Sequence, residues 1–171
     1  QQPEPGGDHP RYQPQGVVGE AQALRHCLAC HRLAIPRPGL TAVADAVGEK
    51  HGVRTMSVLG DLTKSADMDR VVDETIRAFG AIDILVHNAG GDIAAKGGKP
   101  DPNDVVNIRE QDVRAVLDRN LLSTILTCQT VARGMMQRRT GRIITIGSVA
   151  AFRGRTNGAI YAVAKAGVTH F

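Results

Sequence analysis

The chain has 171 residues, enough for one domain with a hydrophobic core, and with 42% hydrophobic and 22% charged residues its composition is that of a globular protein. A net charge of +4 does not indicate nucleic-acid binding, because aromatic residues make up 3% of the chain and the arginines are mostly scattered. No stretch approaches the roughly eighteen apolar residues of a membrane span, and no apolar signal-peptide region is visible. We therefore expect a cytoplasmic protein that binds neither nucleic acid nor membrane.

The first part of the chain shows little that predicts packed structure. Residues 1–15 contain four prolines and no apolar run, which is typical of a disordered tail, so we place the domain at residues 16–171. Further on, Cys27-Leu28-Ala29-Cys30-His31 matches the attachment pattern of c-type haem. Haem attachment of that type needs export, for which no signal-peptide region is visible. Zinc would need a second Cys/His pair, and none follows. We therefore predict no metal site and interpret these cysteines as incidental.

From residue 40 onward, predicted helices and strands alternate, which is the pattern of a doubly wound α/β sheet with parallel strands. Ser65 is the predicted N-cap of its helix, and Gly80 stands where that helix should stop. The long loop at residues 91–107 opens from the presumed active-site edge, where it could either help to cover substrate or be a plain surface loop. The expected elements are helices at residues 40–50, 65–79, 110–139 and from about 159, and strands at residues 54–59, 82–87 and 142–146.

The most informative pattern lies near the C-terminal end. Tyr161 and Lys165 are four residues apart in a predicted helix, so their side chains fall on one helix face. An ammonium beside a phenol stabilises the phenolate, which prepares a tyrosine for general acid/base catalysis. Ser148 follows an apolar strand and should emerge at the carboxyl end, the edge where open α/β sheets bind ligands. These three residues together indicate a site of hydride transfer.

Further motifs in the same order and spacing make the chain resemble the short-chain dehydrogenase/reductase family. A lone Tyr-x-x-x-Lys would be weak, but the ordered set extends over about a hundred residues. The resemblance implies a Rossmann-like doubly wound parallel sheet, NAD or NADP as cofactor, and a small alcohol or ketone as substrate. The further motifs are Asp61-Leu62 after the strand at residues 54–59, Asn88-Ala89-Gly90 after the strand at residues 82–87, and Asn120 in the long helix.

The resemblance also implies a role for each residue. Tyr161 would give or take the proton of the substrate oxygen while hydride moves to or from the nicotinamide, and Ser148 would hydrogen-bond that oxygen. Lys165 would support the phenolate and bind the nicotinamide ribose, while Asn120 would hold a water that relays protons to solvent. The remaining cofactor contacts are expected from Asp61, Leu62, Asn88, Ala89, Gly90 and Gly19, besides Tyr161 and Lys165 themselves.

The chain departs from the family pattern at both ends. The family's first strand is followed by Thr-Gly-x-x-x-Gly-x-Gly, whose backbone binds the cofactor pyrophosphate. That loop should fall near residues 12–19, where Gly19 alone is in register and no apolar strand precedes it. The chain also ends about one and a half turns after Lys165. We therefore expect a fragment with an incomplete sheet.

Two functions stay open from the sequence. One is an NAD(P)-dependent oxidoreductase that interconverts an alcohol and a ketone, which in the intact family is a homo-oligomer, either a dimer or a tetramer. The other is a non-enzymatic fragment of such an enzyme, acting as a partner of a full-length homologue or without function. The residues that would distinguish NAD from NADP fall in the atypical segment around Arg37, so the choice of cofactor is not predicted.

Overall fold

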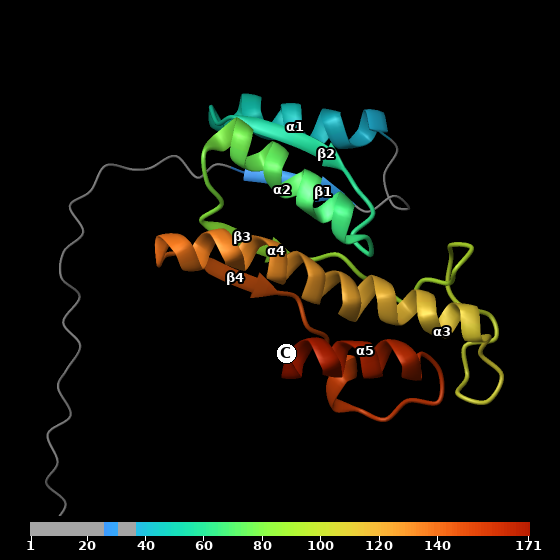
Figure 1. Cartoon of the computed structure of the whole chain (residues 1–171). Helices are drawn as coiled ribbons and strands as arrows, with labels where there is room; N and C mark the ends of the chain where they lie inside the picture. The colour runs from blue at the N-terminus through green and yellow to red at the C-terminus, as the bar shows by residue number, and fades with distance from the viewer. Residues whose placement is uncertain (1–25, 31–36) are drawn as a thin grey trace, which may run out of the picture.

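The computed structural model describes residues 26–30 and 37–171, with side chains from residue 41 (Figure 1). Strands and helices alternate along the chain, which confirms the predicted α/β class. The tail predicted at residues 1–15 and the cofactor contact predicted at Gly19 lie outside the described residues. The elements are strands β1 (His26–Cys30), β2 (Thr55–Leu59), β3 (Ile84–His87) and β4 (Arg142–Thr145), and helices α1 (Arg37–His51), α2 (Ser65–Phe79), α3 (Glu110–Leu117), α4 (Ser123–Arg138) and α5 (Ala159–His170).

The four strands of the described residues form two parallel pairs. β1 pairs with β2, starting with His26 beside Thr55, and β3 pairs with β4, starting with Ile84 beside Arg142. β1 and β3 are the inner strands of the two pairs, and no other strand of the described residues lies between them (Figure 1). In a doubly wound sheet of order 3-2-1-4-5-6, the place between these pairs belongs to the first strand. Within residues 26–30 and 37–171, no strand occupies that place.

Two features of the backbone differ from the sequence-based expectation. The segment His26–Cys30, which we interpreted as atypical, is a strand. It pairs in parallel with β2, and this pairing could not be predicted from the residues of the segment alone. The helix predicted at residues 110–139 contains a π-helical turn, Asp118–Leu122, between α3 and α4. The backbone stays right-handed through this turn, so apolar periodicity gives no sign of it. Turns of this kind often occur at functional sites.

Helix α2 occupies the predicted range, and its end agrees with the prediction while its cap does not. Gly80 stops the helix with φ of 88°, a conformation that glycine adopts without strain. Ser65 is already the first helical residue, so Lys64 takes the N-cap position and makes no side-chain cap bond. The carboxylate of Asp67 accepts a hydrogen bond from the Asp61 N–H at 2.7 Å instead. This bond ties the turn after β2 to the first turn of α2.

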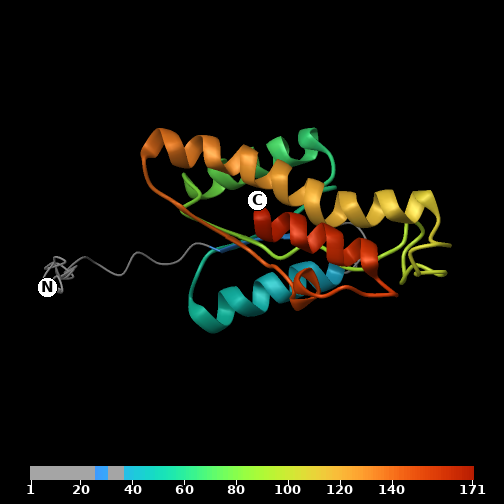
Figure 2. The ribbon, with the colours of Figure 1, turned by 90° about the horizontal axis from the view of Figure 1, so that it is seen from below.

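The helices lie on both sides of the strands, with α2 and α4 on one side and α1 on the other (Figure 2). Two small apolar clusters join α2 and α4 to the strands. In the first cluster Leu62, which follows β2, is buried, and Ala89, which follows β3, packs against that cluster. The segments that leave β2 and β3 therefore meet at one edge of the strands. The clusters consist of Val58, Leu62, Met68 and Val71 with Met56, Ala89 and Leu126, and of Val72, Val131 and Met135 with Ile82 and Leu85.

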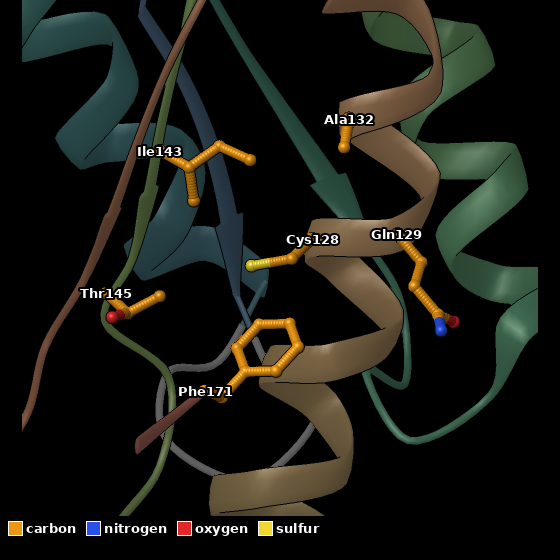
Figure 3. Close-up of a pocket in the computed structure, with 6 residues that line it drawn as sticks. All are labelled: Cys128, Gln129, Ala132, Ile143, Thr145 and Phe171. Carbon is orange, nitrogen blue, oxygen red and sulfur yellow. The ribbon is translucent and has the colours of Figure 1, made fainter. Parts of the chain in front are cut away.

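A cavity of about 380 Å³ lies between α4, β4 and the end of α5 (Figure 3). Cys128 of α4 and Phe171, the last residue of the sequence, both line it. Burial raises the pKa of the Cys128 thiol, so this side chain behaves as a small apolar residue. None of the residues predicted to form the site lines this cavity. The lining is completed by Gln129, Ala132, Ile143 and Thr145.

Candidate active site

The site forms where β3 and β4 end side by side. Beyond β4 the Ile146 N–H still donates to the His87 carbonyl at 3.1 Å, so the two strands remain in register up to their carboxyl ends. The turn that begins at Asn88 leaves β3 from this edge, and Ser148 follows β4 from the same edge. The carboxyl edge of a parallel sheet is where α/β proteins bind ligands. The structure thus gathers the motifs predicted after these two strands.

Asn120 clamps the turn after β3 to the long helix. Its side chain is fully buried, and the π-helical turn directs it at Gly91. The carboxamide oxygen accepts from the Gly91 N–H at 2.9 Å, and the amide nitrogen donates to the carbonyls of Gly91 at 2.9 Å and Val116 at 2.7 Å. These bonds leave the side chain little capacity for a ligand. The water that we predicted at Asn120 would have to use its main-chain carbonyl, which already accepts from Thr124 at 2.6 Å.

Gly90 is the point where the turn, the long helix and α5 come together. Its φ is 141°, a conformation that residues with a side chain rarely adopt. A Cβ atom at this position would lie 2.4 Å from the Asn120 carboxamide oxygen and 3.6 Å from the Lys165 ammonium nitrogen. A glycine is therefore required for Asn120 and Lys165 to approach the turn together. The structure brings these three predicted residues into direct proximity.

Lys165 is held inside this edge with its ammonium at the end of β4. The residue is 5% exposed, and its Nζ donates to the Ile146 carbonyl at 2.7 Å. Burial lowers the pKa of Lys165, because desolvation penalises the charged form. An ammonium has three N–H donors, and Ile146 is its one hydrogen-bond acceptor in the described part of the chain. Two donors are thus available to a ligand.

Tyr161 lies one helical turn before Lys165 on α5, as the spacing predicted. The Lys165 ammonium nitrogen is 6.0 Å from the centre of the tyrosine ring, and the tyrosine is half-buried. Ser148 is also half-buried, and its hydroxyl oxygen accepts from the Ala150 N–H at 3.1 Å. That bond caps the short 3-10 helix Val149–Phe152, which packs against α5. Within the described ranges no acceptor is recorded for the Ser148 hydroxyl proton, so it can donate to a second partner.

The segments predicted to contact the adenine end of the cofactor have local roles in the fold. Asp61 folds back on its own turn, where its carboxylate accepts from the Thr63 N–H at 3.1 Å and hydroxyl at 2.7 Å. The Leu62 side chain is buried in the first cluster, so its main chain alone can reach a ligand. Asn88 is exposed, and Ala89 packs against that cluster. Cofactor contacts by these residues remain predictions.

His87 is a buried polar residue of the site that sequence reasoning missed. It is 5% exposed, and its Nδ1 lies 3.3 Å from the Thr124 hydroxyl. That hydroxyl also donates to the Asn120 carbonyl at 2.6 Å, which favours Nδ1 as the donor in the contact with His87, and Nε2 has no partner among the described residues. Burial lowers the pKa of His87, and the charge of Lys165 adds to this effect. The sequence signal was a histidine placed directly before Asn88-Ala89-Gly90.

The long loop after the turn is anchored at both ends, which the sequence did not reveal. Near its start, the fully buried Asp112 carboxylate accepts from the Ala95 N–H at 2.8 Å and from the Arg109 guanidinium at 2.8 Å. The Ala95 bond, followed by the Arg109 guanidinium, holds the pKa of Asp112 below its usual value. Farther along, the Asn103 carbonyl accepts from the N–H of Gly158, the N-cap of α5, at 3.0 Å. The loop therefore lies against the start of the helix that carries Tyr161.

Comparison with known proteins identifies the class of protein that this fold and site define. The sequence model of the short chain dehydrogenase family matches residues 25–171, so the chain belongs to that family. A cyclohexanol dehydrogenase from Rhodococcus sp. (strain TK6) is 35% identical over 122 residues, which cover 70% of this chain and 44% of the relative. The 3-oxoacyl-[acyl-carrier-protein] reductase FabG of Escherichia coli (strain K12) is 33% identical over 128 residues, covering 75% of this chain and 49% of the relative. The chain spans about half the length of these curated relatives.

Solved structures of the family agree with the fold. A crystal structure of NAD⁺-bound xylitol dehydrogenase matches with a TM-score of 0.71 and 29% identity, covering 84% of this chain and 52% of that protein. Levodione reductase matches with a TM-score of 0.72 and 25% identity, covering 85% and 53%. The predicted family and its Rossmann-like fold are thereby confirmed. Within residues 26–30 and 37–171, no helix has the length and apolar character needed to cross a membrane.

Proposed function

We propose that the chain carries the catalytic part of an NAD(P)-dependent oxidoreductase that interconverts an alcohol and a ketone. The observation that supports this most strongly is the meeting of Gly90, Asn120 and Lys165 at the carboxyl edge of β3 and β4, with Tyr161 one helical turn from Lys165. Membership of the short-chain dehydrogenase family supports a nicotinamide cofactor. The substrate would be a small alcohol or ketone, and the assembled enzyme a homo-oligomer.

The residues present fit the nicotinamide end of such a cofactor. Gly90 presents bare backbone next to Lys165, whose ammonium keeps two unused donors for hydroxyl oxygens. When bound, the dinucleotide would supply or accept the hydride, and Lys165 with Tyr161 would hold its ribose. The pyrophosphate-binding segment expected near residues 12–19 lies outside the described part of the chain. The described residues therefore allow cofactor binding to be tested at the nicotinamide end of the site.

The proton steps follow from the side chains. In the reducing direction, the Tyr161 hydroxyl would give its proton to the carbonyl oxygen while the carbonyl carbon accepts hydride, so the ketone becomes an alcohol. Ser148 would donate its free hydroxyl proton as a hydrogen bond to the same oxygen and stabilise the charge that develops there. The ammonium of Lys165 would stabilise the phenolate that remains on Tyr161 until solvent returns a proton. Oxidation would reverse these steps.

A second candidate function is a non-enzymatic one. The two strand pairs are not joined by any strand of the described residues, and a dinucleotide site of this class is built around the strand that would join them. On this alternative the chain acts as a partner of a full-length homologue, or has no function of its own. Cofactor binding distinguishes the two candidates, because the second does not require it.

The test is a titration of the purified chain with NADH and with NADPH, followed by the fluorescence of the reduced nicotinamide. We expect binding, and Lys165→Met should weaken it at least about tenfold, since two charge-assisted hydrogen bonds of about 1 kcal/mol or more are lost. Lys50→Met is the matched control, because it removes the same charge from an exposed position at the end of α1. If neither cofactor binds at millimolar concentration, the second candidate is favoured.

A further inference from the structure

His87 is a buried titratable residue of the candidate active site to which the proton steps proposed above give no role. The residue is 5% exposed and occupies the last position of β3, directly before Asn88-Ala89-Gly90. Its Nδ1 lies 3.3 Å from the Thr124 hydroxyl oxygen, and its buried Nε2 has no hydrogen-bond partner among the described residues. Buried polar atoms are nearly always hydrogen-bonded, so a bare ring nitrogen at this place needs an explanation.

The side chain of His87 is linked to Asn120 through Thr124. The Thr124 hydroxyl has one proton and donates to the Asn120 carbonyl at 2.6 Å. This arrangement favours an Nδ1–H donor in the contact with His87, which leaves Nε2 unprotonated in the neutral ring. The Asn120 side chain in turn makes two hydrogen bonds of 2.9 Å to the Gly91 peptide groups. The tautomer of His87 is therefore connected to the turn after β3 by a chain of hydrogen bonds.

The main chain of His87 leads to Lys165 by a second route. The His87 carbonyl accepts from the Ile146 N–H at 3.1 Å, and the Ile146 carbonyl accepts from the Lys165 ammonium at 2.7 Å. Within residues 41–171, whose burial the structure describes, Lys165 is the one buried lysine or arginine. A single residue at the end of β4 thus joins the histidine to the buried cation of the site.

The charged group that acts on the ring is this ammonium. Burial lowers the pKa of His87 most, and the charge of Lys165 lowers it further. Of the elements packed against β3, β4 places Thr145 in register with His87, and α4 contributes Thr124 and, one turn later, Cys128. Both hydroxyls are neutral, and burial raises the pKa of the Cys128 thiol, so that it stays neutral too. Among the described residues, no carboxylate contributes to the pKa of the ring.

A second proton on the ring would conflict with Lys165. It would turn Nε2 into a buried donor without an acceptor among the described residues, and it would bring a second positive charge to the buried ammonium. Such a coupling is reciprocal: a proton on His87 disfavours the ammonium by the factor by which the ammonium disfavours that proton. A charged ring would therefore weaken the hold of the site on its lysine cation.

We propose that His87 is a positioning residue whose ring must be neutral, with its proton on Nδ1, for Thr124 to hold Asn120 and for the Lys165 ammonium to bind the cofactor. The neutral ring supplies a hydrogen-bond donor without a second charge. Acid would protonate the ring and withdraw the ammonium from the nicotinamide ribose. The effect on the cofactor rests on the proposed function, whereas the tautomer and the titration of His87 do not.

NMR of the chain labelled with ¹⁵N-histidine tests the state of the ring without cofactor, because long-range ¹H–¹⁵N spectra distinguish the two tautomers. At about pH 7.5 we expect His87 to be neutral with its proton on Nδ1. Lys165→Met should raise the proton affinity of His87 at least about threefold, because a repelling charge is removed. Lys50→Met is the matched control and should leave that affinity unchanged, since Lys50 lies at the far end of α1.

Two further variants separate the hydrogen bond from the charge. Thr124→Val keeps nearly the same side-chain shape but removes the acceptor of the Nδ1–H, so this tautomer should no longer predominate. His87→Asn keeps a donor at the δ position and does not titrate in this range. Between about pH 7.5 and pH 5, the affinity for NAD⁺ or NADP⁺ measured by calorimetry should fall at least about twofold more in the parent than in His87→Asn. His51→Asn, which changes an exposed histidine, should lose as much as the parent.

Three results would each overturn the proposal. The first is a proton on Nε2 in the neutral parent, and the second is an unchanged proton affinity of His87 in Lys165→Met. The third is an equal loss of cofactor affinity on acidification in the parent and in His87→Asn. Circular dichroism verifies folding, and Lys165→Gln replaces Lys165→Met if the latter does not fold. If neither cofactor binds at about pH 7.5, the proposed function fails, and the first two results still decide the role of His87.

Discussion

The contact between Gly90 and Asn120 can be tested by adding a single methyl group. In Gly90→Ala the new Cβ would lie 2.4 Å from the Asn120 carboxamide oxygen, a distance that forces Asn120 to move. Asn120 cannot move without losing its two hydrogen bonds with the Gly91 peptide groups. Gly97→Ala is the control, because Gly97 also has a positive φ, of 89°, but nothing lies within 4 Å of its Cβ position.

The magnitude follows from the two bonds that are lost. Each buried hydrogen bond contributes about 1 kcal/mol, so Gly90→Ala should cost about 2 kcal/mol more than Gly97→Ala, which is about 30-fold in a local equilibrium constant. The Gly91 amide donates directly to Asn120 and reports this loss. We expect hydrogen exchange measured by NMR to show protection of that amide about 30-fold lower in Gly90→Ala than in Gly97→Ala. Protection within about threefold of the control would show that the Asn120 side chain does not hold the turn in this way.

Four further predictions concern the chemistry and the stability of the chain. The first three use a chimera in which E. coli FabG supplies those parts of its own length that the match to this chain does not cover. Tyr161→Phe should reduce turnover about 10²–10⁴-fold at unchanged cofactor affinity, because the ring still packs but cannot transfer a proton; turnover within about threefold would exclude this role. Lys165→Met should weaken turnover and cofactor binding together, so a steady-state assay that shows neither effect removes Lys165 from the site. The pKa of His87 is lowered in the folded state, so the unfolded state binds its proton first and stability should fall as the pH drops below about 6.5; urea titrations should show a smaller loss in His87→Asn, and an equal loss would contradict this. The 171-residue chain by itself should unfold without a sharp transition in calorimetry, since β1 and β3 each have one edge that no strand of the described residues pairs with; a cooperative transition with strong amide protection across residues 82–86 and 143–146 in a monomer would show that it folds alone.

Features set by short stretches of sequence were predicted well. The end of helix α2 was predicted from Gly80, a signal that acts within a few residues, whereas the N-cap predicted at Ser65 lies one residue too far along the chain. The strands from β2 onward agree with prediction to within one or two residues, because each is an apolar run bounded by turns. The common face of Tyr161 and Lys165 follows from helix geometry alone. The roles of these two residues in catalysis stay predictions.

Features that depend on distant segments could not be predicted. Lys165 is positioned by the carbonyl of Ile146, a backbone group that every residue type has. Asn120 binds Gly91 across 29 residues, through a π-helical turn that leaves the apolar pattern unchanged. β1 becomes a strand through its pairing with β2, and its own sequence resembles a haem-attachment pattern more than a strand. In each case the group that fixes the position of the residue or strand lies far from it in the sequence.

We propose that the edge around Gly90 and Lys165 binds the nicotinamide end of a dinucleotide. An NMR titration of the ¹⁵N-labelled chain with NADH tests it most directly, because each amide reports its own surroundings. We expect saturable shifts at the amides of Gly90, Gly91 and Lys165 that are lost in Lys165→Met, and no shift at the exposed Met136 of α4. Shifts confined to other parts of the chain, or no shifts at millimolar NADH, would contradict it.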